Sequence, residues 1–313
     1  MSGLDQLAKV LNKSMETTAD LASGMGVDVN EEIIMKTFQE SPLLQVLEGK
    51  KRTRDVDKAE VTFFLEEPTN TAEFIEEGGT LPDFGKTKYT PVTDRMKELV
   101  ESISISELAQ DGTAVADLAE REITRAFLQV ENLQDYTLLN GTGTAASKDF
   151  ASILKDIPNS NKLSVDPAGP VTEDAIDNLL IQLVDGCGSR PDLLVTDNFV
   201  AKQLKDIAEP YRRYNDKVEI GIGFKVASYT SPDGSEIPIL VDKHMPSGTN
   251  ASPSHKILAL DTNAVDIAYL HRPAVKEMPS TTLSNNFVVR THVTACNIAP
   301  WRCGLLEGIK KAE

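Results

Sequence analysis

One long amphipathic helix is the feature of this sequence that most constrains its fold. Asp111-Gly112 form a good N-cap region, apolar residues then recur at helical spacing through 113–139, and Asn140-Gly141 ends the pattern. The apolar stripe comprises Val115, Ala119, Ile123, Phe127, Val130 and Leu133. About 27 residues at about 1.5 Å each make a rod of roughly 40 Å, whereas the mean globular helix has about 11–12 residues. We expect this stripe to pack on strands predicted within 265–299.

A long turn-rich segment precedes the helix. A β-branched and aromatic run at 61–65 and an alternating strand at 99–106 enclose it. A loop of about thirty residues is uncommon inside a compact domain. This segment nevertheless keeps apolar contact groups, namely Phe74, Ile75, Leu81, Phe84 and Tyr89. The combination favours a protruding hairpin that assembly stabilises.

The second half of the chain alternates helix and strand without an internal repeat. Its predicted helices are 172–186 and 197–209, and its predicted strands are 191–196, 224–230, 236–242, 256–261, 265–270 and 287–299. Helices and strands that occur in blocks indicate an α+β fold.

The N-terminal region has two open interpretations. Apolar spacing predicts helices within 1–23 and at about 31–39, where Pro42 lies beyond the helix end, and Gly24 and Gly26 separate the two. They form either an arm laid on another molecule or an ordinary domain edge. The basic run at 49–58 is likewise either a solvated linker or a contact with an acidic neighbour or packaged nucleic acid.

Charge excludes some classes of function. The net charge is −16, from 48 acidic and 32 basic residues, so the surface repels nucleic acid and anionic membranes and general DNA binding is disfavoured. No apolar run has the length of a signal peptide or of the ~20 residues that span a bilayer, so a soluble, unexported protein is expected. Three scattered cysteines indicate free core thiols.

No catalytic, cofactor or metal-binding constellation appears. The sequence has no phosphate loop, no complete dinucleotide fingerprint, and neither a zinc-protease nor a nucleophile-elbow motif. The four histidines, His244, His255, His271 and His292, show no ligand-like pairing. We therefore predict no enzyme, no cofactor and no metal site.

The order of these segments resembles the major capsid proteins of tailed phages, which share the Hong Kong 97-type fold. Residues 73–112 are similar to that family's extended loop and return strand, which ends here in Ser106-Glu107-Leu108. The run Leu138-Leu139-Asn140-Gly141-Thr142-Gly143-Thr144 resembles the exit of its spine helix. Three later segments follow in the family's order: 190–207, 237–248 and 257–277. The stretch after Gly143 lacks the expected small-residue turn, which leaves the boundary near 145–155 open.

The resemblance implies an α+β Hong Kong 97-type capsid fold with an N-terminal arm, an extended β-hairpin loop, a long spine helix, and peripheral and axial domains. The implied boundaries are 1–55 for the arm, 56–105 for the extended loop and return strand, 106–171 for the peripheral domain with the spine helix at 113–139, 172–265 for the axial domain, and 266–313 for the C-terminal peripheral strands.

The implied function is that of a major capsid protein, which self-assembles into the icosahedral head shell around the dsDNA genome of a tailed virus. Its partners would be itself, in hexamers and pentamers, a separate scaffolding protein, a portal and decoration proteins. The DNA would be enclosed without sequence-specific binding, and no membrane would take part. The expected location is the virion capsid, assembled in the host cytoplasm. Inter-subunit contacts are expected from Lys50, Lys51, Arg52, Arg54, Phe74, Glu76, Glu77, Phe84, Lys86 and Lys88.

Two alternatives stay open on the sequence. The first is an encapsulin-type nanocompartment shell, which shares the fold but encloses a cargo enzyme; the long N-terminal arm weighs against it. The second is a soluble α+β enzyme of unknown class. The missing catalytic constellation and the long turn-rich segment before the helix both count against it.

Overall fold

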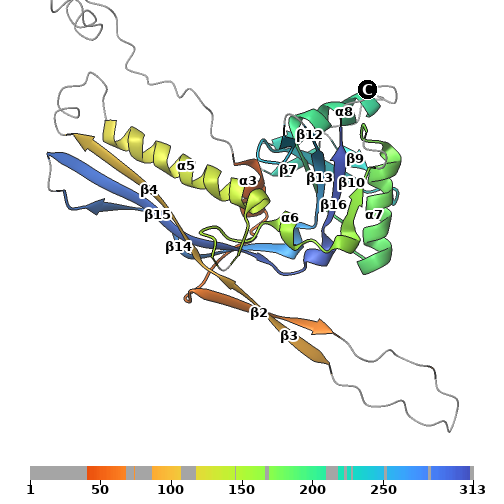
Figure 1. The fold of residues 1–313 in the computed structure, drawn as a ribbon, viewed down its shortest axis with the longest axis horizontal. Coiled ribbons are helices and arrows are strands. Elements are labelled where there is room, and N and C mark those ends of the chain that lie inside the picture. The colour runs from red at the N-terminus through yellow and green to blue at the C-terminus, as the bar shows by residue number, and fades with distance from the viewer. Residues whose placement is uncertain are drawn as a thin grey trace, which may run out of the picture.

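The computed structural model describes residues 41–67, 74, 87–106, 118–144, 146–165, 169–208, 218–221, 224–226, 228–249, 252–280 and 283–310. A long four-stranded sheet lies along helix α5 (Leu118–Asn140), and a six-stranded sheet carries helices α7 (Glu173–Cys187) and α8 (Asn198–Ala208) (Figure 1). A hairpin of strands β2 (Glu60–Glu67) and β3 (Lys88–Arg95) projects away from both sheets. This arrangement is α+β, as predicted.

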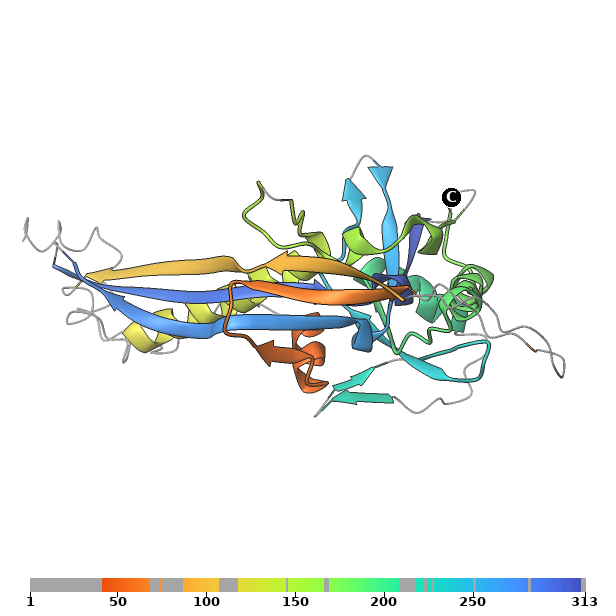
Figure 2. The same ribbon diagram turned by 90° about the horizontal axis from the view of Figure 1, so that it is seen from below.

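The four-stranded sheet has the order β1-β14-β15-β4. Its central strands, β14 (Val265–Met278) and β15 (Ser284–Asn297), are antiparallel and have 14 residues each, against about five or six in an ordinary strand. Strand β4 (Lys97–Ser106) pairs antiparallel with β15, and β1 (Thr53–Asp55) runs parallel to β14. The result is a ribbon long enough to support the whole of α5 (Figure 2).

Helix α5 covers one face of this ribbon with a line of residues spaced by four. Its fully buried members are Ala126, Val130, Gln134 and Leu138. Spacing by four keeps side chains on one face because a helix has 3.6 residues per turn. The line packs with Leu99 and Ile103 of β4 and with Val289 of β15 in one hydrophobic cluster.

The predicted stripe on this helix is confirmed over its middle. Ile123 and Phe127 pack against the same core, and Val130 is buried. The prediction is wrong for Leu133, which is 50% exposed. A buried line spaced by four drifts by about 40° every four residues, so at this level it runs through Gln134, about 100° around the helix from Leu133. The predicted helix start, with Val115, lies outside the described residues.

Two glycines turn the chain sharply after α5. The backbone N–H of Gly141 donates to the Thr137 carbonyl at 2.8 Å, and a β-carbon at Gly141 would lie 2.1 Å from the carbonyl oxygen of Phe150. Gly143 has a φ of +53°, and a β-carbon there would lie 2.3 Å from Ala151. The returning chain therefore leaves room only for glycine at both positions.

The six-stranded sheet has the order β5-β16-β13-β6-β10-β9. Its strands are β5 (Lys162–Ser164), β6 (Leu193–Thr196), β9 (Ser228–Thr230), β10 (Glu236–Val241), β13 (His255–Leu260) and β16 (Gly304–Ile309). Every residue of β6 is buried, as expected of a strand that is covered on both faces. Leu194 packs in the cluster formed with α7 and α8, whereas Leu193 and Val195 face the opposite core.

One hydrophobic core connects the two sheets. Helix α3 (Pro42–Gly49) contributes Leu43 and Leu47, both fully buried, and helix α6 (Ile153–Asp156) contributes Ile153. These residues belong to the same cluster as the inner faces of β4, α5 and β15 on one side and of β6 and β13 on the other. The two sheets are therefore joined by packing as well as by the chain.

Three strands pair elsewhere than the predicted boundaries place them. Strand β16 lies within the predicted peripheral range 266–313, yet it pairs with β13 in the six-stranded sheet. Strand β5, within 106–171, pairs with β16. Strand β1, within the predicted arm 1–55, extends the four-stranded sheet. Short strands carry little periodicity, so only long-range pairing reveals their sheet.

Pro42 begins a helix that is not predicted from the sequence. It stands at the first position of α3, where its missing N–H costs no helical hydrogen bond. The helices predicted within 1–23 and 31–39 lie outside the described residues.

Two small antiparallel pairs complete the described fold: β7 (Val218–Gly221) with β8 (Phe224–Val226), and β11 (Gly248–Thr249) with β12 (Ser252–Pro253). Among the described helices, none is long and apolar enough to cross a membrane.

Candidate functional site

The projecting hairpin β2–β3 has one face that nothing in the described chain covers. The register pairs Phe64 with Pro91 and Glu66 with Tyr89, and because side chains alternate along a strand these four lie on one side. Phe64 is 67% exposed and Tyr89 is 61% exposed. We call this side the outer hairpin face, defined by Thr62, Phe64, Glu66, Tyr89, Pro91 and Thr93. Diagonal cross-strand neighbours such as Phe64 and Tyr89 lie about 7–8 Å apart, which makes a small aromatic patch.

The base of the hairpin is anchored on its other side. Val61 is buried against Ala268 of β14 and Cys296 of β15, and Phe63 packs on the same small cluster. Ala268 lies between residues whose side chains face α5, so this cluster sits on the sheet face opposite the helix. The hairpin is thus fixed at its root, while its outer face is free to contact another chain.

Asp94 is the ionisable group on the inner side of the hairpin base. Burial raises the pKa of its carboxyl to about 6, and the negative charge of Asp156 adds to the rise, while the charge of Arg54 opposes it. Protonation of this carboxyl is therefore coupled to how the hairpin root packs.

The basic run at 49–58 is partly used inside the subunit. The Lys50 ammonium pairs with the Asp192 carboxylate at 2.6 Å and lies 3.4 Å from the Thr262 hydroxyl. Arg52 and Arg54 are half-buried, with guanidinium nitrogens that have no hydrogen-bond partner among the described residues. Lys51 is exposed at a positive φ of 58°.

Of the contacts predicted on the extended loop, the structure describes two. Phe74 is fully exposed, and Lys88 is exposed on β3. Glu76, Glu77, Phe84 and Lys86 lie outside the described residues.

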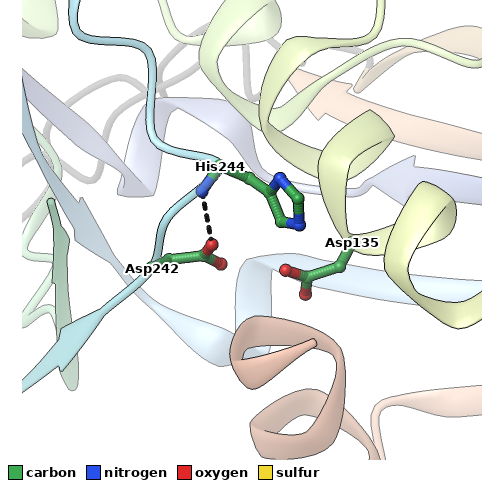
Figure 3. Close-up of side chains that lie close together, drawn as sticks. All are labelled: Asp135, Asp242 and His244. Carbon is green, nitrogen blue, oxygen red and sulfur yellow. Dashed lines mark hydrogen bonds between the residues drawn. The ribbon is translucent and has the colours of Figure 1, made fainter. Parts of the chain in front are cut away.

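A buried carboxylate pair lies where three parts of the fold meet. Asp135 projects from α5, Asp242 follows β10, and His244 lies on the turn after it (Figure 3). Both aspartates have no exposed surface. One ligand atom from each of the three residues lies within 4.8 Å of the other two.

Each carboxylate is oriented by one backbone donor. The N–H of Leu44, in the first turn of α3, donates to Asp135 Oδ1 at 2.7 Å, and the N–H of His244 donates to Asp242 Oδ1 at 2.8 Å. The other oxygen of each aspartate, Oδ2, has no donor among the other described groups, and the two carboxyl groups hydrogen-bond to each other. Burial and the neighbouring Asp242 charge raise the pKa of Asp135, and the Lys243 ammonium acts in the opposite direction.

The imidazole of His244 is held from two sides. Its Nε2 lies 3.0 Å from Asn132 Oδ1, and its ring meets that of Tyr136 edge-on at 5.6 Å between centroids. The Asn140 side chain donates to the His244 carbonyl at 2.7 Å. Burial lowers the pKa of His244, which favours the neutral imidazole.

Sequence reasoning misses this cluster for two reasons. Gln134 belongs to the buried line of α5 and Asp135 is buried beside it, whereas a search for an apolar stripe registers hydrophobic positions alone. Asp242 and His244 are brought to α5 only by the tertiary packing of β10. The useful signal is polar residues at stripe positions of an otherwise apolar helix end.

The other histidines have partners within the chain. His255 pairs with Asp197 and stacks on Phe199, and the rings of His271 and His292 meet edge-on at 5.2 Å. The cysteine prediction is right for Cys296 and Cys303, which are buried, and wrong for Cys187, which is exposed.

Comparison with known proteins identifies what this architecture is similar to. The family model described as "SU10 major capsid protein" matches residues 11–310. A search of curated protein sequences finds no significant match.

Solved structures share the fold at low sequence identity. The capsid of the native GTA particle aligns with a TM-score of 0.66 and 15% identity, covering 93% of this chain and 98% of that one. Mycobacterium phage Adephagia gives 0.64 and 14%, with 95% and 98% covered. The holo-SrpI encapsulin complex of Synechococcus elongatus gives 0.64 and 12%, with 93% and 95% covered.

Proposed function

The chain belongs to the SU10 major capsid protein family, and we propose from this premise how its parts build a shell. It is a shell-forming capsid protein with the Hong Kong 97-type α+β fold, and the virion capsid is its location. The proposal is that copies of the chain associate through the outer hairpin face into pentamers and hexamers of an icosahedral head around dsDNA. Its role is structural, without catalysis.

The exposed hairpin carries this proposal. A two-stranded hairpin is marginally stable alone, and this one projects with Phe64 and Tyr89 uncovered. Exposed aromatic rings with low conformational entropy are favoured contact groups in protein interfaces. A neighbouring subunit that covers the outer hairpin face would supply the missing layer.

The two sheets divide the remaining roles. The four-stranded sheet with α5 serves as the peripheral domain, and the six-stranded sheet with α7 and α8 serves as the axial domain near the five-fold and six-fold positions. The axial part comprises 172–265 together with β16, because β16 completes that sheet. Residues 1–55 act as an arm that reaches a neighbouring subunit, and α3 and β1 form its root inside the subunit.

Charge supports an electrostatic contribution between subunits. Lys51 is exposed beside the arm root, and the excursion of a neighbour is rich in acids, so an ion pair there would contribute about 0.2–1 kcal/mol. Repetition over a shell would multiply this effect. Assembly yield that does not change with salt or with Lys51→Glu would contradict the contribution.

The net charge of −16 bears on the other partners. An acidic shell protein encloses DNA without binding its sequence, since like charges repel at long range. A separate scaffolding protein, a portal and decoration proteins complete the assembly in the host cytoplasm. A nanocompartment shell is the second candidate, because an encapsulin complex shares the fold; co-purified cargo enzyme inside the shells would favour it.

Electron microscopy of purified protein tests the proposal. We expect wild-type chain to form closed shells, and a Phe64→Ser, Tyr89→Ser double variant to remain as folded subunits. The matched control is Phe64→Tyr with Tyr89→Phe, which keeps both rings and should assemble. Normal shells from the serine variant would refute the role of the outer hairpin face. A wild-type chain that stays monomeric at high concentration, with no shells under any condition, would refute the shell function.

A further inference from the structure

The buried aspartate pair of Figure 3 has the construction of a metal site. We propose that Asp135, Asp242 and His244 bind one divalent transition-metal ion of the zinc class, where α3, α5 and the turn after β10 meet. The inference is independent of shell assembly, since all three ligands come from one chain.

The carboxylates are preorganised for a shared ligand. Each directs its Oδ1 to one backbone N–H, from Leu44 and from His244. Each Oδ2 lacks a donor among the other described groups, so the two carboxyl groups hydrogen-bond to each other, and an ion between them would take the place of the shared proton. Both side chains have no exposed surface, so water at the surface does not solvate those oxygens. Buried polar atoms without partners are rare in native proteins, and outer hydrogen bonds that fix ligand orientation are a regular feature of metal centres.

His244 adds a nitrogen donor to the two oxygens. In Figure 3 its imidazole points toward Asp135. The His244 imidazole is held by Asn132, whose Oδ1 lies 3.0 Å from the histidine Nε2. Asn132 and Asp135 are three residues apart on α5 and therefore share a face. The asparagine is thus either an outer partner of the histidine or a fourth oxygen donor.

Charge and ligand number select the kind of ion. A divalent cation that displaces the carboxyl proton would meet two carboxylates and a neutral imidazole, and its charge would neutralise both carboxylates. Two oxygens and one nitrogen, with a fourth position open, match the four-coordinate preference of zinc. Calcium needs six to eight oxygens, roughly twice what these residues offer, and magnesium needs octahedral oxygen.

An ion at this point would connect elements that are distant in sequence. Asp135 belongs to the spine helix, Asp242 directly follows β10 of the six-stranded sheet, and the Leu44 N–H belongs to α3. Binding would therefore stabilise the junction between the two sheets, because the ion contacts only the folded arrangement.

Zinc titration of the purified full-length chain tests the site. After chelation and dialysis, calorimetry with ZnCl2 should show one site per chain, and zinc should raise the thermal midpoint while MgCl2 and CaCl2 should not. Asp242→Asn should lose the binding, since an amide replaces the carboxylate at nearly the same size. Asn132→Ala should weaken it about 10- to 100-fold if that residue only orients His244.

A surface histidine pair provides the matched control. His271 is exposed and its ring meets that of His292, so His271→Gln removes a pair of imidazoles outside the proposed site that zinc could bind. Binding should survive this change.

If Asp242→Asn does not fold, two other experiments test the site. His244→Gln should lose zinc binding, and cobalt bound to the wild-type protein should absorb visible light strongly, because tetrahedral nitrogen and oxygen ligation gives intense absorption. Folded wild-type chain that binds no zinc, or binding that both ligand variants retain, would overturn the proposal.

Discussion

The six-stranded sheet and the hairpin β2–β3 are both β-structure, yet they are stabilised in opposite ways. Every residue of β6 is buried, with α7 and α8 over one face and the shared core over the other. In the hairpin, Val61 at the base is buried, while Phe64 and Tyr89 are mostly exposed. The sheet is packed on both faces within the chain, whereas the hairpin is packed only at its base and on its inner face.

The difference separates what folding needs from what assembly needs. Stability of the subunit should depend on the sheet and on the junction with α5, because folding of a single chain removes the apolar surface of those residues from water. Association should depend on the outer hairpin face, which gains a covering layer only from another chain. Changes in the two regions should therefore produce separable effects on unfolding and on assembly.

The largest effect is expected in the sheet. Leu194 has no exposed surface and packs with α7 and α8, so Leu194→Ala should reduce the free energy of unfolding by about 2–5 kcal/mol through lost burial and a cavity. Urea unfolding followed by circular dichroism measures this value. A change below about 1 kcal/mol would mean that the site collapses around the alanine or that the sheet is not the stable part.

A second effect tests the exit of the spine helix. A β-carbon at Gly141 would meet the Phe150 carbonyl oxygen at 2.1 Å, and that backbone cannot move freely. Gly141→Ala should therefore cost about 1–3 kcal/mol by overpacking. Gly186, where a β-carbon would meet nothing within 4 Å, supplies the control: Gly186→Ala in α7 should be neutral or stabilising, since alanine favours helix.

A smaller effect concerns pH at the hairpin root. The pKa of Asp94 is raised to about 6 from 3.8, so the folded chain binds this proton more readily than the unfolded chain. Stability attributable to this group should rise as the pH falls through about 6 toward 4, and should be absent at neutral pH. Asp94→Asn should flatten that part of the stability profile. A wild-type profile that the variant reproduces would show that Asp94 does not titrate there.

The smallest effect on subunit stability is expected at the outer hairpin face. Phe64→Ser should change the free energy of unfolding by no more than about 0.5 kcal/mol, because the ring contacts little within the chain. The same variant should nevertheless reduce shell yield, measured by sedimentation. A large loss of stability would place Phe64 in the subunit core and remove the contrast between the two regions.

Sequence reasoning succeeds here where a pattern is long and local. The helices predicted at 172–186 and 197–209 appear as α7 and α8, and Thr172 caps the first of them through its hydroxyl. The spine helix and its glycine exit are likewise visible in the sequence, because periodicity and terminator residues act over a few turns.

The parts that sequence reasoning misses depend on distant contacts. Strand β16 joins β13 across many intervening residues, and no local period reports that choice. Asp135 is missed because hydrophobic spacing alone defines a stripe, although its side chain is completely buried beside Asp242. Lys50 is predicted as a contact between subunits, and whether it also serves there stays a prediction; within the chain it pairs with Asp192.

Hydrogen exchange in free subunits and in assembled shells tests the central contrast most directly. We predict that the amides of β2 and β3 exchange much more slowly in shells than in free subunits, while those of β6 exchange at similar slow rates in both states. Equal protection of the hairpin in the two states would contradict the account, because it would mean that neighbouring subunits do not cover the outer hairpin face.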